Sequence, residues 1–465
     1  MVNFINIKIE LALILLGLVL AFHSFSQDTV YINPSVSENT IDDGSREHPF
    51  DSWDDLHWSD KSYMNGKVFL QKCGTEFDVV KGGGYKLKNM ADIVFGSYGQ
   101  GKKPVIHSVA DTLTWLFDVK WCRNIVFENI HFIGDTNIAG NPVTLSPVRV
   151  WGVLGHKKAE KGNIRIVNCE SEYFEYGFRL MYTNNVAVDS CFIHHYGLQG
   201  IVAFSVWNAD YGWNTIKDGN TKWYPGADQV YSQGACIAVG GKIYNNHIHH
   251  CLLDRHKTGN KFAIFLNADS TSCRPSIIEY NTVISPRDTK EKGAGIYICS
   301  RADSSIIRYN HFSGELGAIA VRTRLVHIYY NVFEGDYYGI DAPNDDGTFI
   351  YNNVFYKVQP CIKGDHITAM NNIFYVSEEN KGYALQLKGI NKIGYNCVNR
   401  PDKSINKSNL IVSDPQFIDP ENGDFHLKAS SPCIDKGTDV GLKYDKDGNP
   451  VPEGAGVDIG AYEVK

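Results

Sequence analysis

Two pairs of adjacent histidines carry the clearest chemical signal in the sequence. They close two five-residue segments of similar form, Cys191–His195 and Asn246–His250. A histidine near its unperturbed pKa can take or give a proton at neutral pH. If the two segments occupy the same position in neighbouring turns of a stacked fold, the pairs lie about 5 Å apart. We therefore predict a double row that supplies a catalytic base or acid, formed by His194, His195, His249 and His250. The alternative is surface or turn histidines without a role.

Arginine and tyrosine side chains form a second group, on or just after predicted outward positions of strands. Arginine can bind a sugar carboxylate through two parallel hydrogen bonds, and a tyrosine can remove or supply a proton. We predict Tyr297, Arg179 and Arg322 as catalytic and Arg301 and Arg324 as substrate-binding. The alternative is that these arginines are solvated and paired with nearby aspartates such as Asp303 and Asp341.

Aromatic residues concentrate in one stretch, residues 205–234, which interrupts the spacing of the surrounding sequence. An indole packs well on the C–H face of a pyranose ring, and long loops on a rigid scaffold often carry function. We predict Trp207, Trp213 and Trp223 as substrate-binding residues. The alternative is a loop that is anchored by its own aromatic cluster.

Carboxylates follow several predicted strands and leave two further chemistries open. They are Asp269, Asp303, Asp341, Asp345 and Asp346. A pair across a groove could serve glycoside hydrolysis or hold Ca²⁺. The segment Asp445–Asn449 resembles a calcium loop but lacks the closing glutamate, which favours a simple turn. Ca²⁺ is thus the one cofactor left open, no metal ligands are assigned, and the absence of Cys-x-x-Cys argues against structural zinc.

The elements that position these residues are marked by a recurring Asn-x-apolar motif. It begins at Asn129, Asn246, Asn281, Asn310, Asn331, Asn353, Asn372 and Asn396, and in most turns an apolar residue stands three positions earlier. A period of about 20–24 residues with strand-like content indicates a solenoid of stacked turns. An Asn side chain can donate to one neighbour and accept from the other. Cys169 and Cys191 occupy the same position, so we expect buried thiols rather than a disulfide framework.

The chain divides into four segments on this pattern. Residues 1–26 have the basic, apolar and small-residue order of a secretory signal peptide. Residues 27–120 are expected to form an N-terminal cap and the first turns, and residues 121–412 the parallel β-helix with the insertion 205–234. Residues 413–465 are rich in Pro, Gly and Asp and are expected to close the far end. Helical periodicity is nearly absent after the signal, so the predicted class is all-β.

Composition limits the classes of partner that the protein can bind. The net charge of −7 and the lack of a dense basic run argue against binding to nucleic acid. The first apolar run is short for a membrane span and no later run is longer, so we expect no membrane span and a secreted or periplasmic protein. The oligomeric state is left unknown by the sequence.

In its repeat and its C-terminal segment, the chain resembles exported bacterial right-handed parallel β-helix proteins that act on polysaccharides. The resemblance rests on the Asn steps, the Gly99–Ile106 segment and the closing tail, and covers nearly the whole mature chain. It implies the fold but not the reaction, because that fold carries lyases, hydrolases, epimerases and binding proteins. The Asn-Thr-Asp, Asp-Asp and Gly-His-Gly set of pectin hydrolases does not occur together, and the Asn-Gly-x-Asn-x-Glu-x-Ile-Arg stretch of chondroitinase B and alginate lyases is absent. No catalytic residue is therefore carried over.

The favoured hypothesis is an exported lyase. Its substrate would be an acidic polysaccharide, with or without sulfate groups, or its oligosaccharides, cleaved by β-elimination. A terminal sugar that loses water in a dehydratase reaction is the other form of this hypothesis. A glycoside hydrolase on the same scaffold and a non-catalytic carbohydrate-binding protein are the alternatives.

Overall fold

The computed structural model describes most of the chain after the predicted signal. The described residues are 28–36, 42–80, 83–109, 115–135, 145–152, 162–219, 234–242, 245–255, 262–269, 275–285, 293–314, 317–335, 338–343, 347–377, 382–405 and 409–465. The predicted signal peptide, residues 1–26, and Trp223 lie outside them. Within these ranges, no helix is both long and apolar enough to cross a membrane.

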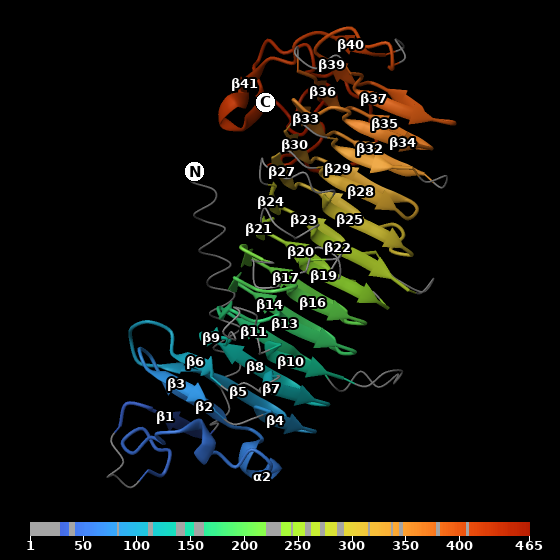
Figure 1. Cartoon of the computed structure of the whole chain (residues 1–465). Coiled ribbons are helices and arrows are strands. Elements are labelled where there is room, and N and C mark those ends of the chain that lie inside the picture. Colours follow the sequence, from blue (N-terminus) through green and yellow to red (C-terminus); the bar gives the residue numbers. More distant parts are fainter. Residues whose placement is uncertain are drawn as a thin grey trace.

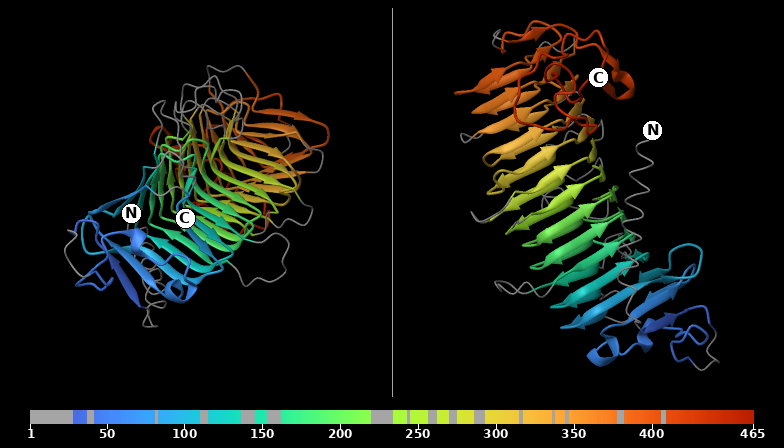
Figure 2. Two further views of the ribbon diagram at one scale, coloured as in Figure 1. Left: turned by 60° about the horizontal axis from the view of Figure 1, so that its bottom comes forward. Right: turned by 180° about the vertical axis from the view of Figure 1, so that it is seen from behind.

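Three long parallel sheets coil around one axis, as Figures 1 and 2 show. Sheet A contains, in order, β1 (Thr29–Ile32), β2 (Val68–Lys72), β5 (Ala91–Tyr98), β8 (Arg123–Glu128), β11 (Ile164–Val167), β14 (Asn184–Asp189), β17 (Trp207–Gly212), β20 (His247–His249), β23 (Ile277–Glu279), β26 (Ile306–Arg308), β29 (Val326–Tyr329), β32 (Thr348–Tyr351), β35 (Ile367–Met370) and β38 (Lys392–Gly394).

Sheet B follows sheet A in each turn of the coil. It contains β3 (Glu76–Val79), β6 (Val105–Ser108), β9 (His131–Ile133), β12 (Glu170–Glu172), β15 (Phe192–His194), β18 (Thr215–Ile216), β21 (Leu252–Asp254), β24 (Thr282–Ser285), β27 (His311–Gly314), β30 (Val332–Glu334), β33 (Val354–Tyr356), β36 (Ile373–Tyr375), β39 (Cys397–Val398) and β40 (Ile411–Val412).

Sheet C completes each turn. It contains β4 (Tyr85–Lys88), β7 (Trp115–Lys120), β10 (Ser146–Trp151), β13 (Tyr176–Met181), β16 (Gln199–Phe204), β19 (Ala235–Gly241), β22 (Phe262–Ala268), β25 (Ala294–Ser300), β28 (Ile319–Arg322), β31 (Ile340–Ala342), β34 (Ile362–Asp365) and β37 (Leu385–Lys388). The all-β parallel β-helix expected from the sequence is thereby confirmed.

Alternation along each strand separates core from surface. In sheet C, Ile264, Ile296 and Ile319 lie in register and are fully buried inside the coil. The residues between them, such as Tyr297, point to the outer face. Because neighbouring strands are parallel and in register, like side chains stack along the axis and one continuous core forms.

The predicted asparagine ladder exists from Asn281 onward. Asn281, Asn310, Asn331, Asn353, Asn372 and Asn396 are buried at the two-residue bend between sheets A and B. Each side-chain nitrogen in this row, from Asn281 to Asn372, donates to the next side-chain oxygen at 3.0–3.1 Å. The same oxygens accept backbone N–H groups, so the ladder satisfies polar groups that the bend would otherwise bury unpaired.

The upstream part of the ladder differs from the prediction. Cys169 and Cys191 do occupy the ladder position, but the next two occupants are Asn214 and Cys251. The Asn214 side-chain oxygen accepts from the Cys191 backbone N–H, and the Asn214 side-chain nitrogen lies 3.9 Å from Cys251 Sγ. The Cys251 backbone N–H donates in turn to the Asn281 side chain. Asn246 lies five residues before Cys251, the ladder residue of its turn, and its side chain accepts from the backbone N–H of Ala209 on sheet A. Asn129 stands one residue before the ladder and has positive φ.

The segment 205–234, expected as one insertion, contains a regular turn of the coil. Residues 207–212 and 215–216 form β17 and β18, which pair with strands of the neighbouring turns on both sides. Asn214 supplies the ladder residue of this turn, but Tyr211 takes the place of the usual aliphatic residue three positions earlier. Residues 220–233 lie outside the described residues.

The C-terminal segment folds back along the side of the coil instead of closing its end. It contains β41 (Phe417–Asp419), the 3-10 helix η2 (Pro420–Asn422) and β42 (Asp424–Leu427). Its backbone reaches back to Tyr309 and Asn352, and Figures 1 and 2 show it in red beside the last turns. The far end is covered instead by the chain near Ile405, which joins the main core. At the other end, η1 (Trp53–Asp55) and α2 (Lys61–Met64) cover the first turns, with Trp53 fully buried.

Candidate functional site

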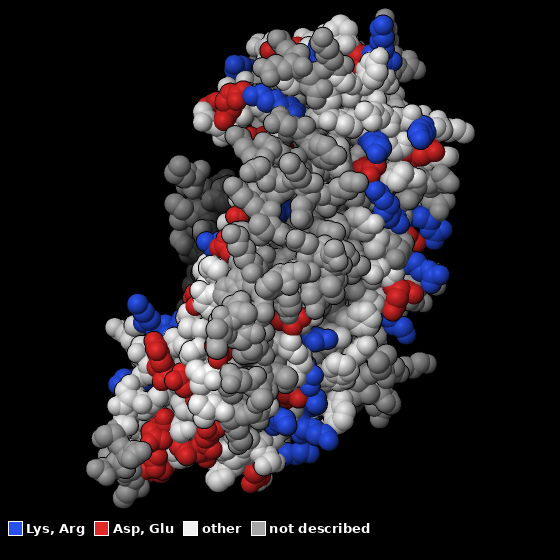
Figure 3. Space-filling model, viewed as in Figure 1, with Lys and Arg blue, Asp and Glu red and all other residues white. Residues whose placement is uncertain are grey.

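A hollow of about 450 Å³ lies on the outer face of sheet C near the N-terminal end. Its volume is in the range of small-molecule sites. Strands β4, β7 and β10 and the residue after β7 line it with four cationic side chains, two tryptophans and one carboxylate: Lys86, Lys88, Lys120, Arg149, Trp121, Trp151 and Asp118. Figure 3 shows Lys and Arg side chains gathered over this end of the sheet.

Asp118 organises the cations of the hollow. Its buried carboxylate accepts from Arg149 Nε at 2.9 Å and from Arg149 Nη2 at 2.9 Å, and Lys120 Nζ lies 3.0 Å away. Such a two-point contact fixes the orientation of a guanidinium. The hollow therefore keeps excess positive charge in a defined position.

Aromatic rings support the same cations. The Arg149 guanidinium lies 4.2 Å from the centre of the Trp115 ring and 5.6 Å from Trp151, and Lys88 lies 5.0 Å from the Trp121 ring. Tyr182 extends this rim, with its ring 5.3 Å from that of Trp151. Flat rings beside fixed cations are the features that bind an acidic sugar: C–H groups pack on the ring and the acid group meets the cation.

Arg179, predicted from the sequence, joins this site. It is in register with Arg149, and its guanidinium lies over Trp115 and Tyr176 at 5.4 and 5.0 Å. No carboxylate among the described residues forms an ion pair with it. Its charge is therefore available to a ligand.

The other predicted arginines lie elsewhere. Arg322 pairs with Asp341 at 2.6 Å and Arg324 with Asp303 at 2.9 Å, which is the alternative that the sequence left open. Arg301 is exposed and donates to the backbone oxygen of Asp269 at 3.4 Å. None of the three lines the hollow.

Tyr297 also lies on the outer face of sheet C, but among apolar neighbours. Its ring is 4.8 Å from Phe262 and 5.8 Å from Phe265. Both phenylalanines are buried although they point away from the core of the coil. This part of the face is an apolar cluster, five strands further along the sheet than Arg149.

The predicted double row of histidines is wrong in its register. His194 ends β15 in sheet B, whereas His249 ends β20 in sheet A. In sheet B the positions aligned with His194 in the next two turns belong to Lys217 and Asp254. The error follows from the ladder: the predicted insertion contains a whole turn of the coil, and the ladder residue beside the second pair is Cys251, not Asn246.

Each histidine pair belongs to its own cluster. On sheet B, His194 and His195 approach through their Nδ1 atoms at 2.7 Å, beside Glu170, Glu172 and His131. Burial lowers the pKa of His194. Burial opposes the charged form of Glu172, but the hydrogen bond from His131 and the nearby imidazoles outweigh it and hold the pKa of that carboxyl below its usual value.

The second cluster lies on sheet A. His247 contacts Asp210 at 3.2 Å and Glu279 at 2.9 Å, and His249 contacts Asp210 at 3.0 Å. Burial alone would lower the pKa of His247, but the hydrogen bonds to these two carboxylates raise it to about 9. Arg308 also pairs with Glu279. The cluster is a compensated network of charges.

His250 and Trp213 share a structural role that sequence reasoning missed. Both occupy the left-handed position just before the ladder, with φ of 51° and 56°. Their rings stack at 4.1 Å, and His250 stacks in turn on Tyr280 at 4.9 Å. Burial and the neighbouring His249 lower the pKa of His250 to about 4. Trp207, at the start of β17, lies on sheet A and outside the hollow on sheet C.

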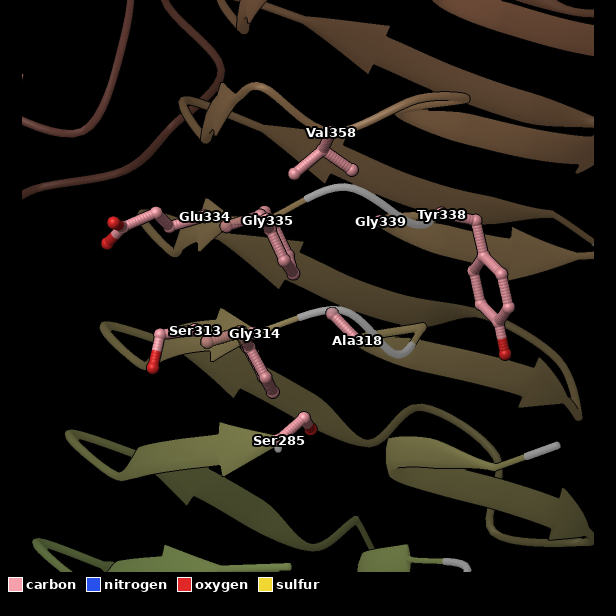
Figure 4. Close-up of a pocket in the computed structure, with 11 residues that line it drawn as sticks. Ser285, Ser313, Gly314, Ala318, Glu334, Gly335, Tyr338, Gly339 and Val358 are labelled. Carbon is pink, nitrogen blue, oxygen red and sulfur yellow. The ribbon is translucent and has the colours of Figure 1, made fainter. Parts of the chain in front are cut away.

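Two remaining features, a small cavity and the calcium-like segment around Asp445, do not form a substrate site. Figure 4 shows a cavity of about 10 Å³ beside the stacked Gly314 and Gly335, which is room for about one water. At Gly314, with φ of 116°, a Cβ would lie 1.7 Å from the Ser285 backbone oxygen, so the close stacking requires glycine. Asp445, in the calcium-like segment, accepts backbone N–H groups of Asp447, Asn449 and Glu463, as in a turn.

Sequence reasoning missed most of the hollow. Trp115 and Lys120 lie at the end of the predicted cap, and Arg149 lies inside the predicted β-helix, between the predicted ladder positions Asn129 and Cys169. The signal was present as alternation: Asp118 and Lys120 stand two apart on one strand, as do Arg149 and Trp151.

Comparisons with known proteins agree with the architecture. No protein-family model matches the sequence, and no curated protein sequence matches it. Solved structures with a similar fold include pectate lyase Pel9A, with 14% identity, 95% of this chain and 98% of that chain covered and a TM-score of 0.45. The A-module of mannuronan C-5 epimerase AlgE4 from Azotobacter vinelandii has 11% identity, coverage of 75% and 91% and a TM-score of 0.46.

A third similar structure is the PL6 family alginate lyase AlyGC, with 14% identity and a TM-score of 0.46, where the match covers 79% of this chain and 53% of that one. Glycoside hydrolases also match. The three parallel sheets define the chain as a parallel β-helix protein, and the similar structures named above are carbohydrate-active enzymes.

Proposed function

We propose that the protein is an exported lyase that cleaves an acidic polysaccharide or oligosaccharide by β-elimination in the hollow on sheet C. One observation carries the proposal: the hollow combines four cations and flanking tryptophans with a single carboxylate, Asp118, which is already bound to Arg149 and Lys120. This composition suits an anionic sugar.

Arg179 would bind the sugar carboxylate, and Arg149, which Asp118 holds through Nε and Nη2, would add positive charge beside it. Neutralising that group makes the neighbouring C–H proton more acidic, which is the first requirement of elimination. A base then takes the proton, a C=C bond forms and the C–O bond to the leaving sugar breaks. The leaving oxygen takes up a proton. Beside the hollow, Tyr182 is a candidate base, and Lys120, whose Nζ lies 3.0 Å from Asp118, is a candidate proton donor.

The alternative of glycoside hydrolysis has less support at this site. Hydrolysis of the usual kind needs two carboxyl groups flanking the bond, about 5–10 Å apart. Among the described residues, the lining of the hollow offers only Asp118. Asp303 and Asp341, named from the sequence for such a pair, are bound to Arg324 and Arg322.

Product analysis tests the reaction. The protein is incubated with a panel of uronic-acid polymers, and the ultraviolet absorbance of unsaturated sugar is measured together with new reducing ends. Elimination predicts that both rise together with at least one acidic polymer. New reducing ends without absorbance would show hydrolysis and contradict the proposal, and so would the absence of both across the panel.

A further inference from the structure

Five side chains from three consecutive strands of sheet B converge on its outer face. His131 comes from β9, Glu170 and Glu172 from β12, and His194 and His195 from the end of β15. Strand register brings Glu172 directly beside His194. The cluster lies on a different sheet from the hollow and has no part in the proposed elimination.

We propose that Glu172, His194 and His195 bind a divalent metal ion of the Zn²⁺ type. A carboxylate oxygen and one nitrogen of each imidazole lie within 4.8 Å of one another. The Nδ1 atoms of the two histidines are 2.7 Å apart, and His194 Nδ1 is 3.7 Å from Glu172 Oε2. Ligands about 2.0–2.2 Å from a tetrahedral zinc ion lie about 3.3–3.6 Å apart. The distance from His194 Nδ1 to Glu172 Oε2 is close to that value, and the two imidazoles would move apart by somewhat less than about 1 Å to admit the ion.

The surroundings match an outer shell for those ligands. His194 Nε2 lies 3.2 Å from Glu170 Oε1, so its N–H can donate to that carboxylate. Nδ1 then carries no proton, and its lone pair, which faces His195 Nδ1, can bind the ion. Glu172 Oε1 accepts from His131 Nε2 at 2.9 Å, which orients its other oxygen toward His194. Metal-binding imidazoles and carboxylates are commonly fixed in this way.

Ligand chemistry selects the kind of ion. Two imidazole nitrogens favour zinc and related transition metals, whereas calcium and magnesium take oxygen ligands. Within the described residues, no Lys or Arg pairs with Glu170 or Glu172. A dication would therefore neutralise two carboxylates that otherwise meet only imidazoles.

The other histidine pair provides an internal contrast. His249 and His250 also approach through Nδ1, at 3.0 Å. The adjacent carboxylate, Glu279, is already held by Arg308 and His247, and His250 is stacked between Trp213 and Tyr280. Asp210, 3.0 Å from His249, forms a second group of three possible ligands with His247 and His249, so the test must distinguish the two sheets.

A bound ion would link two neighbouring turns of the coil. Glu172 and His195 precede the connections that lead into β13 and β16 of sheet C, so the ion would fix the start of both strands. Three protein ligands leave one position of a tetrahedral ion for water. The predicted effects are metal-dependent stability and a spectroscopic signature.

The test uses the full chain after treatment with a chelator. Co²⁺ is added as the probe, its visible absorption band is titrated, and the melting temperature is measured with and without Zn²⁺. His195→Asn is the main variant, because Asn tolerates the left-handed backbone of that residue, φ 48°. Glu172→Gln is the second variant, and His249→Gln is the matched control from the other pair.

We expect one Co²⁺ per chain with the band of four-coordinate cobalt, and a rise in melting temperature with Zn²⁺. Either sheet B variant should weaken binding at least tenfold while circular dichroism stays that of the wild type, and His249→Gln should leave binding unchanged. Absence of a saturable cobalt band in the wild type would overturn the proposal. Loss of the band in His249→Gln alone would overturn it as well, because the ion would then belong to sheet A.

Discussion

At the scale of single residues, position on the coil separates similar side chains into different roles. Arg179 and Arg322 both lie on sheet C, but Arg322 is paired with Asp341 and Arg179 has no carboxylate partner among the described residues. Likewise His195 belongs to a cluster that lacks Lys or Arg among its described partners, while His250 is part of a stack of rings. The residue type alone does not distinguish these cases, because the partners come from neighbouring turns.

The charged network around His247 predicts a pH dependence of stability. The pKa of His247 is raised from about 6.5 in the unfolded chain to about 9 in the fold by Asp210 and Glu279, against the effect of burial. The stabilisation is therefore complete below about pH 6.5 and is lost as the pH rises through about 9. Its size is on the order of 1 kcal/mol, because the side chain is 37% exposed and solvent screens the pairs.

Melting curves of the wild type and His247→Gln from pH 6 to pH 10 check this. The wild type should be the more stable protein at pH 6, and the difference should vanish toward pH 10. A difference that does not change with pH would show that the charge of His247 is not involved.

At the scale of elements, the asparagine ladder fixes the bend between sheets A and B. Asn331 accepts from the backbone and side chain of Asn310 and donates to Asn353, all within the buried bend. The upstream turns show that the position also accepts a small buried residue such as Cys169 or Cys191. In these turns the bend holds a small buried side chain, and the hydrogen-bonded row forms where asparagines occupy adjacent turns.

Replacement of one member in the middle of the row should be costly. Asn331→Ala leaves buried donors of Asn310 and the acceptor of Asn353 without this partner, and an unsatisfied buried group costs about 1–3 kcal/mol. We expect the urea midpoint to fall accordingly. Asn208→Gly is the control: Asn208 is exposed and left-handed, φ 50°, so glycine fits and the change should stay below about 0.5 kcal/mol. Equal effects of the two substitutions would contradict a stabilising role of the ladder.

At the scale of the whole molecule, the repeat predicted the architecture better than the site. From Asn281 to Asn396 the spacing gave the correct register, because every turn keeps asparagine and the bend is short. Between Cys191 and Cys251 the register failed, because Asn214 was not recognised and Asn246 imitates a ladder residue. That one error joined two histidine pairs that lie on different sheets.

The site was largely hidden for a related reason. Of the predicted residues that the structure describes, only Arg179 lies beside the hollow, over the Trp115 ring and in register with Arg149. Trp115, Asp118 and Arg149 come from strands on either side of the expected boundary at residue 120, and they meet only because β7 and β10 pair in register. Alternation shows that such residues point outward, but the pairing partner is set by connection lengths that a single sequence does not reveal.

The most direct test of the hollow as the binding site is the affinity for acidic oligosaccharides, measured by calorimetry at low salt. Arg179→Gln should lower the affinity about tenfold or more, because a charge-assisted hydrogen bond to an acid group is worth about 1.5–3 kcal/mol. Arg324→Gln, on the same scaffold but bound to Asp303, should leave it unchanged. Neutral oligosaccharides should bind weakly to all three proteins. Equal binding of acidic sugars by the wild type and Arg179→Gln, or a larger loss with Arg324→Gln, would contradict the account.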